Sequence, residues 1–393
     1  MKLFAQMGFA NGNKVSKGIS EGSIDGAIFS IKDLDKPQIN STLAELYAIN
    51  QNIETFIDPM FYTSLYGENT SLNIGKISSW DFFNHYKKND LESEKNILTV
   101  LSSYYKEFKE SDFQVSGLIA PNIYISESFD SREAVIAKNF IRLAKETAIK
   151  ANESRPIFAS LVISRETLIN QSEFEEFLND LTEIETPPDG FYLIVGSRTG
   201  KEDLYHTDVI ANWMLLNYSL SINGYKVING YSDLITPFLL VAGGYAGATG
   251  WWSNLRTFTI NRFFPSSGGR LPLLRYLSLK LLSRITGSEL SALSDVNIDL
   301  KNGLSHDKDY DPDPDRADEV LQSWEAISEL LKQFSNSDEI KENLIILTQI
   351  IQSSINWYKI IIQKGIILSK KSQDNHLTPF HEAIEKFIKN AEL

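Results

Sequence analysis

The feature that most constrains this 393-residue chain is a repeated alternation of short apolar runs with longer helical patterns. A weaker run at residues 271–277 follows seven clear ones, which are Ile24–Ser30, Thr55–Pro59, Gly117–Ile125, Ile157–Ser164, Gly190–Gly196, Tyr225–Gly230 and Gly247–Trp251. Near-continuous apolar runs of this length suit parallel strands that are covered on both faces. We therefore expect seven or eight parallel strands.

Helical periodicity fills the intervals between these runs. It is clear at Ser131–Ala151, Glu173–Leu181 and Leu204–Leu216, and the long second interval predicts helices at Trp80–Tyr86 and near Glu92–Phe108. Strand and helix alternating this many times indicate an α/β fold. The count favours a closed (β/α)8 TIM-like barrel, and an open doubly wound sheet is the alternative.

The pattern changes after residue 297. Residues 298–316 are polar, acidic and contain proline, which is typical of an exposed loop or linker. Residues 317–393 contain only helical patterns, one of them the isoleucine-rich Ser337–Lys371. The sequence thus predicts a barrel at 1–297, a linker at 298–316 and an α-helical C-terminal domain at 317–393. The isoleucine-rich helix is expected to pack on the barrel, on itself or on a partner.

Charge and composition narrow the function. The net charge of −13 disfavours binding to nucleic acid or to anionic membranes. The lack of cysteine removes thiol nucleophiles and cysteine-ligated zinc, and it fits a cytoplasmic protein. No apolar run is long enough to predict a membrane span.

No metal site or cofactor is indicated. The aspartates at 307–318 alternate as in a calcium loop, but Pro312 stands where such a loop needs glycine. The five histidines are scattered, without ligand spacing. The identity of any cofactor is therefore left open.

Two aspartates are candidate catalytic residues, because active sites of such barrels lie at the carboxyl ends of the strands. Asp58 ends an apolar run directly before Pro59. It is expected to act as a nucleophile, a general base or a ligand anchor, or else to cap a turn. Asp33 follows the end of the preceding run and either pairs with Asp58 or belongs to an ordinary loop.

Three arginines are candidate phosphate ligands. Arg165, Arg198 and Arg256 each follow a different run, so a barrel would direct them toward one mouth. Alternatively, they form salt bridges to neighbouring acids such as Glu166.

Asn229, Gly250 and Trp251 complete the predicted pocket. Glycine would let a ligand approach the backbone, and the tryptophan would either stack on a ring or belong to the core. The glycines at 243–250 match no phosphate-loop pattern. They are expected to end a helix over Asp233–Ala242 and to begin the next strand.

Residues 190–256 include GFYLIVGSRTGKEDL and YKVINGYSDLITPFLLVAGGYAGATGWW. This order resembles tRNA-guanine transglycosylases, and the resemblance implies a barrel. Thr249, Gly250 and Trp251 stand where that family has its nucleophilic aspartate, and its cysteine–histidine zinc site is impossible here without cysteine. The resemblance therefore does not imply base exchange.

Two functions remain open from the sequence. One is an enzyme or sensor that binds a phosphorylated or nucleotide-like small molecule at the mouth of the barrel. The alternative is a non-catalytic scaffold in a multi-protein prokaryotic system, such as antiviral defence. Its isoleucine-rich helix would then dock a protein partner or a second copy of the chain.

Overall fold

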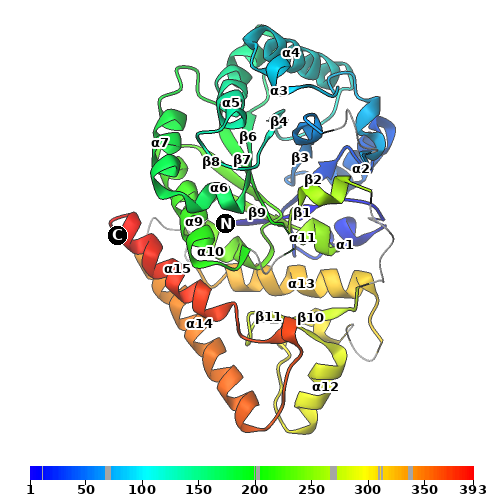
Figure 1. Ribbon diagram of the computed structural model, residues 1–393. Helices are drawn as coiled ribbons and strands as arrows, with labels where there is room; N and C mark the ends of the chain where they lie inside the picture. Colours follow the sequence, from blue (N-terminus) through cyan, green and yellow to red (C-terminus); the bar gives the residue numbers. More distant parts are fainter. Residues whose placement is uncertain are drawn as a thin grey trace.

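The computed structural model describes residues 1–10, 12–66, 72–198, 200, 204–265, 272–308, 310, 313–334 and 340–393. Within them, one parallel sheet has the strand order β3-β2-β1-β9-β8-β7-β6-β4, with β5 also paired to β6 (Figure 1). These strands are β1 Lys2–Gln6, β2 Gly26–Ser30, β3 Glu54–Asp58, β4 Leu118–Ala120, β5 Tyr124–Ile125, β6 Ile157–Ser164, β7 Gly190–Gly196, β8 Lys226–Gly230 and β9 Ala246–Thr249.

The sheet curls into a nearly closed barrel. Residues just before β4 meet β3: the Ser116 amide donates to the Thr55 carbonyl at 2.9 Å, and the Thr55 amide donates to Ser116 Oγ at 3.0 Å. Both β4 and β5 pair with β6, so together they occupy one position in the barrel. The chain therefore has the predicted (β/α)8 architecture, and the open doubly wound sheet does not apply.

The weaker run at 271–277 is not a barrel strand, although the sequence predicted one there. Its described part contributes to β10 (Arg275–Ser278), which pairs antiparallel with β11 (Ser283–Thr286) outside the barrel. The remaining barrel strand is β1, which lies between β2 and β9. Its five residues lack a long apolar run because Lys2 and Gln6 stand at its ends. Only its neighbours in the sheet identify it.

Helices cover the outside of the barrel (Figure 1). They are α1 Lys14–Ser20, α2 Lys36–Ile49, α3 Lys88–Leu91, α4 Glu94–Glu110, α5 Arg132–Lys150, α6 Arg165–Ile169, α7 Gln171–Thr182, α9 Thr207–Ile222, α10 Thr236–Val241 and α11 Ser253–Arg256. Ser131 caps α5 by accepting the Ala134 amide, as its position before the apolar pattern predicted. Gly243, at φ +97°, follows α10 in a conformation that a residue with a Cβ rarely adopts.

The helix predicted at Trp80–Tyr86 does not form. The short 3-10 helix η2 (Gly75–Ser79) precedes this segment, and Trp80 is buried against the rings of Phe82, Phe108 and Phe113. The apolar residues there fill a core of aromatic rings rather than one face of a helix.

The C-terminal region packs against one side of the barrel through α13 (Arg316–Leu331) (Figure 1). It also contains α12 (Gly287–Asp295), α14 (Ile340–Gln363) and α15 (Leu377–Asn390). The helix α15 lies along α9, where the rings of Tyr218 and Phe387 meet at 5.9 Å. None of the described helices is long and apolar enough to cross a membrane.

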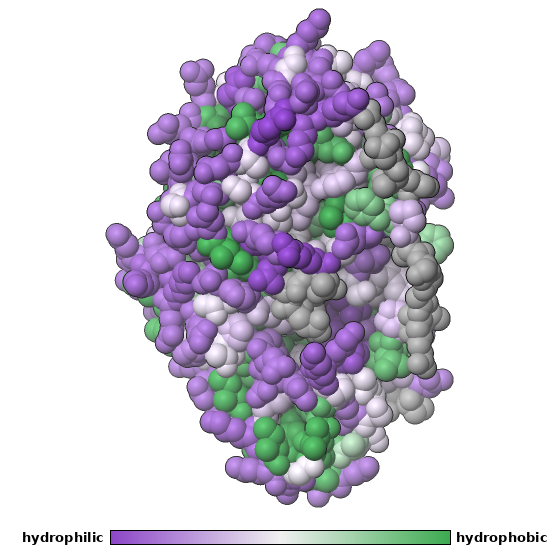
Figure 2. Space-filling view, in the orientation of Figure 1, coloured by the Kyte–Doolittle hydropathy of each residue, from purple (hydrophilic) through white to green (hydrophobic). Residues whose placement is uncertain are grey.

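The isoleucine-rich α14 is only partly covered. Leu347, Ile351 and Ile361 are buried, whereas Ile345 and Ile362 are exposed. Figure 2 shows a largely hydrophilic surface with apolar side chains gathered over the lower end of the C-terminal region.

The central place of β1 gives a stability prediction. Phe4→Ala should lower the free energy of unfolding by about 3–5 kcal/mol, because this fully buried ring packs on Phe56 inside the barrel. Phe9→Ala is the matched control, since its ring is 74% exposed just beyond the same strand. Denaturant unfolding of both variants measures the difference, and equal losses would contradict this placement of β1.

Candidate functional site

Asp58 lies inside the barrel at the carboxyl end of β3. Its Oδ1 accepts the Met60 amide at 2.9 Å, and its Oδ2 accepts the hydroxyls of Tyr62 at 3.1 Å and Tyr192 at 3.3 Å. Burial raises the pKa of this carboxyl from 3.8 to about 6, although these hydrogen bonds and the Arg262 charge oppose the shift. A carboxyl that titrates there can serve as a general base or acid near neutral pH.

Polar side chains from strands that are not neighbours surround Asp58. The Tyr192 hydroxyl, on β7, also lies 3.3 Å from Gln6 Oε1 of β1. Because β1, β3 and β7 are not adjacent in the sheet, these side chains can meet only on the barrel axis. Arg262, on the 3-10 helix η4 (Ile260–Phe263), donates to the Tyr231 hydroxyl at 3.3 Å. We call Gln6, Asp58, Tyr62, Tyr192, Tyr231 and Arg262 the axial cluster.

The segment after β9 closes the barrel above this cluster. Phe258 is completely buried, and its backbone bridges to Gly196 at the end of β7. Its ring lies 5.2 Å from Tyr62 and 5.4 Å from Tyr231, measured between ring centroids. The axial cluster is therefore covered by one aromatic side chain.

Asp33 lies at the rim, on the loop that follows β2. Ser30 Oγ donates to its Oδ2 at 2.8 Å. Both Asp33 and Asp58 are close enough to Arg262 to interact with its charge, but they accept hydrogen bonds from different partners. The structure thus places both candidate aspartates near Arg262, but no hydrogen bond joins them to each other.

The three predicted arginines do not form one clamp. Arg165 and Arg198 both lie beside Glu166, with Nε to Oε1 distances of 3.6 and 3.0 Å. Arg256 instead faces the C-terminal region, where its Nη2 lies 3.1 Å from Glu319 Oε1 of α13. Arg165 and Arg198 therefore follow the alternative prediction, in which they form salt bridges to a neighbouring acid.

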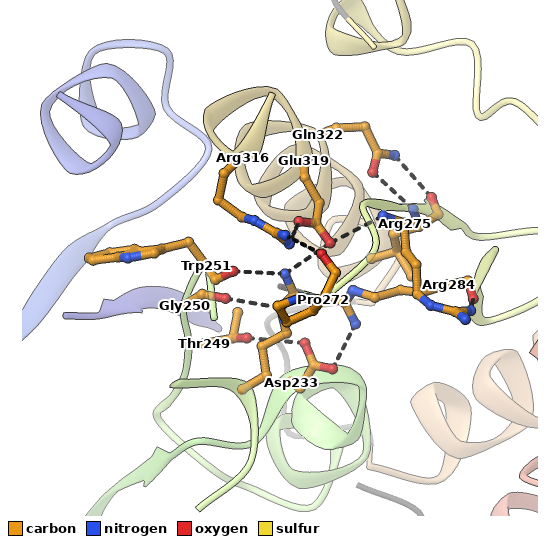
Figure 3. Close-up of polar contacts among 12 residues, drawn as sticks. Asp233, Thr249, Gly250, Trp251, Pro272, Arg275, Arg284, Arg316, Glu319 and Gln322 are labelled. Carbon is orange, nitrogen blue, oxygen red and sulfur yellow. Dashed lines mark hydrogen bonds and ion pairs between the residues drawn. The ribbon is translucent and has the colours of Figure 1, made fainter. Parts of the chain in front are cut away.

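A basic pocket opens between the barrel rim and the C-terminal region (Figure 3). Its volume is about 660 Å³. Six cationic side chains and two carboxylates line it, a difference of four positive charges: Arg256, Arg275, Arg284, Arg316, Lys370 and Lys371 against Asp233 and Glu319. In a protein of net charge −13, such a concentration of positive charge favours an anion.

The two carboxylates hold the arginines in place. Asp233, just after β8, accepts from Arg284 Nη1 of β11 at 2.6 Å and from Thr249 Oγ1 at 3.0 Å (Figure 3). Glu319 binds both Arg256 and Arg316. Arg275 Nη1 donates to the Arg284 carbonyl at 3.0 Å.

Some donors at the pocket remain available. The buried Arg284 Nε has no hydrogen-bond partner. Lys370 and Lys371, which begin the 3-10 helix η6 (Lys370–Ser372), are exposed and form no ion pair with any residue that the structure describes. The two lysines can bind an external anion without first breaking an internal pair.

The other three predicted site residues have structural contacts. Asn229 lies between β8 and α9, where its Oδ1 accepts from Trp213 and Asn217 and its Nδ2 donates to Asn217 Oδ1. A Cβ on Gly250 would come within 2.4 Å of the Gln6 carbonyl, so this glycine permits close packing. Trp251 is buried, donates to the Phe9 carbonyl at 2.9 Å and faces Trp324 of α13.

Gly250 and Trp251 reach the basic pocket only through their carbonyls, which accept from Arg256 (Figure 3). The sequence reasoning missed Gln6, Tyr192, Arg262, Arg275 and Arg284. A hydroxyl inside the apolar run GFYLIVG was the available signal for Tyr192. Arg275 and Arg284 had none, because they reach the barrel only through the packing of the β10–β11 hairpin.

No cluster of histidine and carboxylate side chains suited to a metal ion occurs among the residues that the structure describes.

The fold defines a (β/α)8 barrel protein, and comparisons with known proteins add little. No family model and no curated protein matches the chain. Similar solved structures include an endo-β-1,6-glucanase (10% identity, 63% of this chain, 66% of that chain, TM-score 0.38). Another is an HpcH/HpaI aldolase from Desulfitobacterium hafniense (10% identity, 63% of this chain, 85% of that chain, TM-score 0.33). A third is a thiamine phosphate pyrophosphorylase from Pyrococcus furiosus (12% identity, 66% of this chain, 90% of that chain, TM-score 0.30).

Likenesses this weak carry no argument about activity. The chain spans slightly less than two thirds of the glucanase. The predicted resemblance to tRNA-guanine transglycosylases is confirmed only as far as the barrel.

The Glu319 contacts give a prediction. Glu319→Ala should lower the free energy of unfolding by about 3–5 kcal/mol, because it leaves Arg256 with an unpaired charge between the barrel and α13. Glu329→Ala, on the same helix but paired with Lys332 at the surface, should cost less than about 1 kcal/mol. Chemical unfolding monitors both, and a mild effect of Glu319→Ala would show that the pair does not join the two regions.

The shifted pKa of Asp58 gives a second prediction. The folded protein binds this proton more tightly than the unfolded chain, so the stability that it contributes is present below pH 4 and is lost as the pH rises through about 6. Asp58→Asn removes this loss. Its free energy of unfolding relative to wild type should therefore rise by about 3 kcal/mol between pH 4 and pH 7, since the shift is about two pKa units.

Asp35→Asn is a control at a carboxyl whose pKa shift has the opposite sign. Hydrogen bonds from Gln38 and Lys76 lower the pKa of Asp35 at the start of α2 from 3.8, so its effect on stability changes mainly below pH 4, and the difference between this variant and wild type should stay nearly constant between pH 4 and pH 7. Urea unfolding at both pH values measures the two variants, and a pH-independent difference for Asp58→Asn would contradict the shifted pKa.

Proposed function

We propose that this protein binds a phosphorylated small molecule in the basic pocket and acts on it as a barrel enzyme or sensor. The observation that carries the proposal is the excess of four positive charges around a 660 Å³ pocket in an acidic protein. Pockets of several hundred Å³ accommodate small-molecule ligands, and guanidinium groups match phosphate oxygens in pairs.

The position of the pocket supports the same ligand. Counting β4 and β5 as one position, β8 and β9 are the seventh and eighth strands of the barrel. Asp233 and the segment Ser253–Thr259, which line the pocket, follow these two strands. Barrels of this type frequently bind phosphate with the loops after their seventh and eighth strands.

The internal carboxylates limit which groups the ligand engages. Arg256 and Arg316 already share Glu319, and Arg284 is held by Asp233. The phosphate is therefore expected to bind Lys370, Lys371 and Arg275 directly. Base exchange is not part of the proposal, because Trp251 is buried against Trp324 near the position where the resemblance would require an aspartate.

The scaffold function remains the second candidate. The exposed isoleucines of α14, Ile345 and Ile362, are what support docking of a protein partner or a second copy. They lie on a helix that does not line the basic pocket.

A double variant tests the proposed function. Lys370→Ala/Lys371→Ala should weaken binding of a nucleotide or sugar phosphate by about tenfold or more, because each lysine contributes a charge-assisted hydrogen bond. Isothermal titration calorimetry with a panel of nucleotides and sugar phosphates, at low and at physiological salt, measures the affinities. Binding should also weaken as the salt concentration rises.

The control Lys341→Ala/Lys359→Ala removes the same charge from exposed positions on α14 that do not line the pocket. It should bind as the wild type does. Equal affinity of both double variants, or no binding of any phosphate compound, would overturn the proposal.

A further inference from the structure

The axial cluster contains hydrogen-bond donors that its own residues do not satisfy. Gln6 is fully buried and its Nε2 has no partner, although its Oε1 accepts from Tyr192. Turning the amide over would let Nε2 donate to the Tyr192 hydroxyl but would leave Oε1 without a donor, so the buried amide has one unmatched polar atom in either orientation. Arg262 Nε, at the other end of the cluster, also lacks a partner. A buried N–H without an acceptor is costly, so these groups call for an oxygen from outside the chain.

A proton acceptor lies beside these donors. Tyr192 hydrogen-bonds both Gln6 and Asp58, so the amide and the carboxyl are one hydroxyl apart. The titratable groups that interact with Asp58 are Tyr62, Tyr192, Tyr231, Arg262 and Tyr104 of α4. Burial raises the pKa of each of these tyrosines, so they stay protonated near neutral pH while Asp58 changes its charge.

One extended segment separates the axial cluster from the basic pocket. Thr257 and Thr259 have extended backbone angles and line the basic pocket, whereas Phe258 between them covers the axis. Successive side chains of an extended segment point to opposite sides. The two sites therefore lie on the two faces of the same segment, about the thickness of one sheet layer (~10 Å) apart.

The backbone around the two sites is strained. Met60, Tyr231 and Asp233 all have positive φ angles, of 47°, 55° and 39°. Met60 follows Asp58, and the other two lie in the turn after β8, with Tyr231 at the axis and Asp233 at the basic pocket. Strain of this kind persists where the surrounding structure holds functional groups in fixed positions.

We propose that the axial cluster is a proton-transfer site for a small phosphorylated carbonyl compound, an aldose or ketose phosphate. The inference rests on the proposed function, since the phosphate lies in the basic pocket. The carbonyl end reaches the axis when the Phe258 side chain turns away from it, while the backbone of its segment stays in place. The carbonyl oxygen then accepts the unmet N–H donor of Arg262, with the Gln6 amide beside it, and Asp58 is the base.

The step is balanced without any other reactant. The C–H bond next to the carbonyl breaks, and its proton moves to an Oδ atom of ionised Asp58. The electron pair of that bond forms the C=C bond of an enolate, whose oxygen takes the negative charge beside the N–H donors. Return of a proton from Asp58 restores the carbonyl compound.

Deuterium exchange tests this step directly. Proton NMR in D₂O should show loss of the α-proton signals of dihydroxyacetone phosphate, glyceraldehyde 3-phosphate or a hexose 6-phosphate with wild-type protein. Asp58→Asn should slow this exchange by about 10²–10⁴-fold, because a positioned base is lost. Calorimetry should show that Asp58→Asn still binds the same compound, since its phosphate site is intact.

Two controls separate folding from chemistry. Asp35→Asn changes a surface carboxylate at the start of α2 and should exchange as the wild type does. Lys370→Ala/Lys371→Ala should raise KM for exchange and leave kcat nearly unchanged, because it alters only phosphate binding.

Each outcome decides between the two proposals. Binding of these phosphates without exchange, or exchange that persists in Asp58→Asn, overturns the axial site and leaves the phosphate pocket standing. Exchange that depends on Asp58 but is equally fast with unphosphorylated dihydroxyacetone supports the axial site and overturns its link to the basic pocket. Neither binding nor exchange with any compound overturns both.

Discussion

The buried pair of Arg256 and Glu319 is the interaction on which the rest of this arrangement depends. It joins the segment after the last barrel strand to α13, and the Arg256 guanidinium also binds the carbonyls of Gly250 and Trp251. The course of Ser253–Thr259 is therefore fixed between the barrel and the C-terminal region. One face of this segment then forms a wall of the basic pocket, and the other places Phe258 over the barrel axis.

The same pair explains how an acidic protein maintains a basic pocket. Four arginines close together would repel one another if they were unpaired. Glu319 binds two of them and Asp233 binds a third, which leaves the lysines near η6 to carry most of the available charge. The C-terminal region therefore contributes directly to this pocket. It supplies Arg275, Arg284, Arg316 and both lysines to a site at the rim of the barrel.

Much of the fold could be predicted from the sequence. Seven apolar runs became barrel strands or parts of them, and Ser131 capped its helix where its position indicated. These features depend on contacts that are local along the chain, such as apolar periodicity and capping. The prediction failed at β1 and at 271–277, where each run is short and carries charged or polar residues. In such a run the sequence alone does not decide between a barrel strand and a hairpin, because the outcome depends on which neighbouring strand is available to pair with it.

The candidate site was predictable only in part. Asp58 was identified because a carboxylate at the end of a strand before proline is a local signal, and the structure places it on the barrel axis. Its partners Gln6 and Tyr192 come from strands far along the chain, so no spacing predicts their contact with it. The arginines after three different strands seemed to share one mouth, but side-chain direction separates Arg165 and Arg198 from Arg256.

The sequence by itself favoured a (β/α)8 barrel with a helical C-terminal region and an aspartate at the end of one of its strands. This was possible because the spacing of apolar residues and the polar residues that end each apolar run are local features of the sequence. Only the tertiary structure decided which cations share a pocket, which carboxyl is buried and what covers it. Those properties arise from burial and from contacts between segments more than 50 residues apart, and electrostatic effects depend on distances in space rather than on position in the sequence.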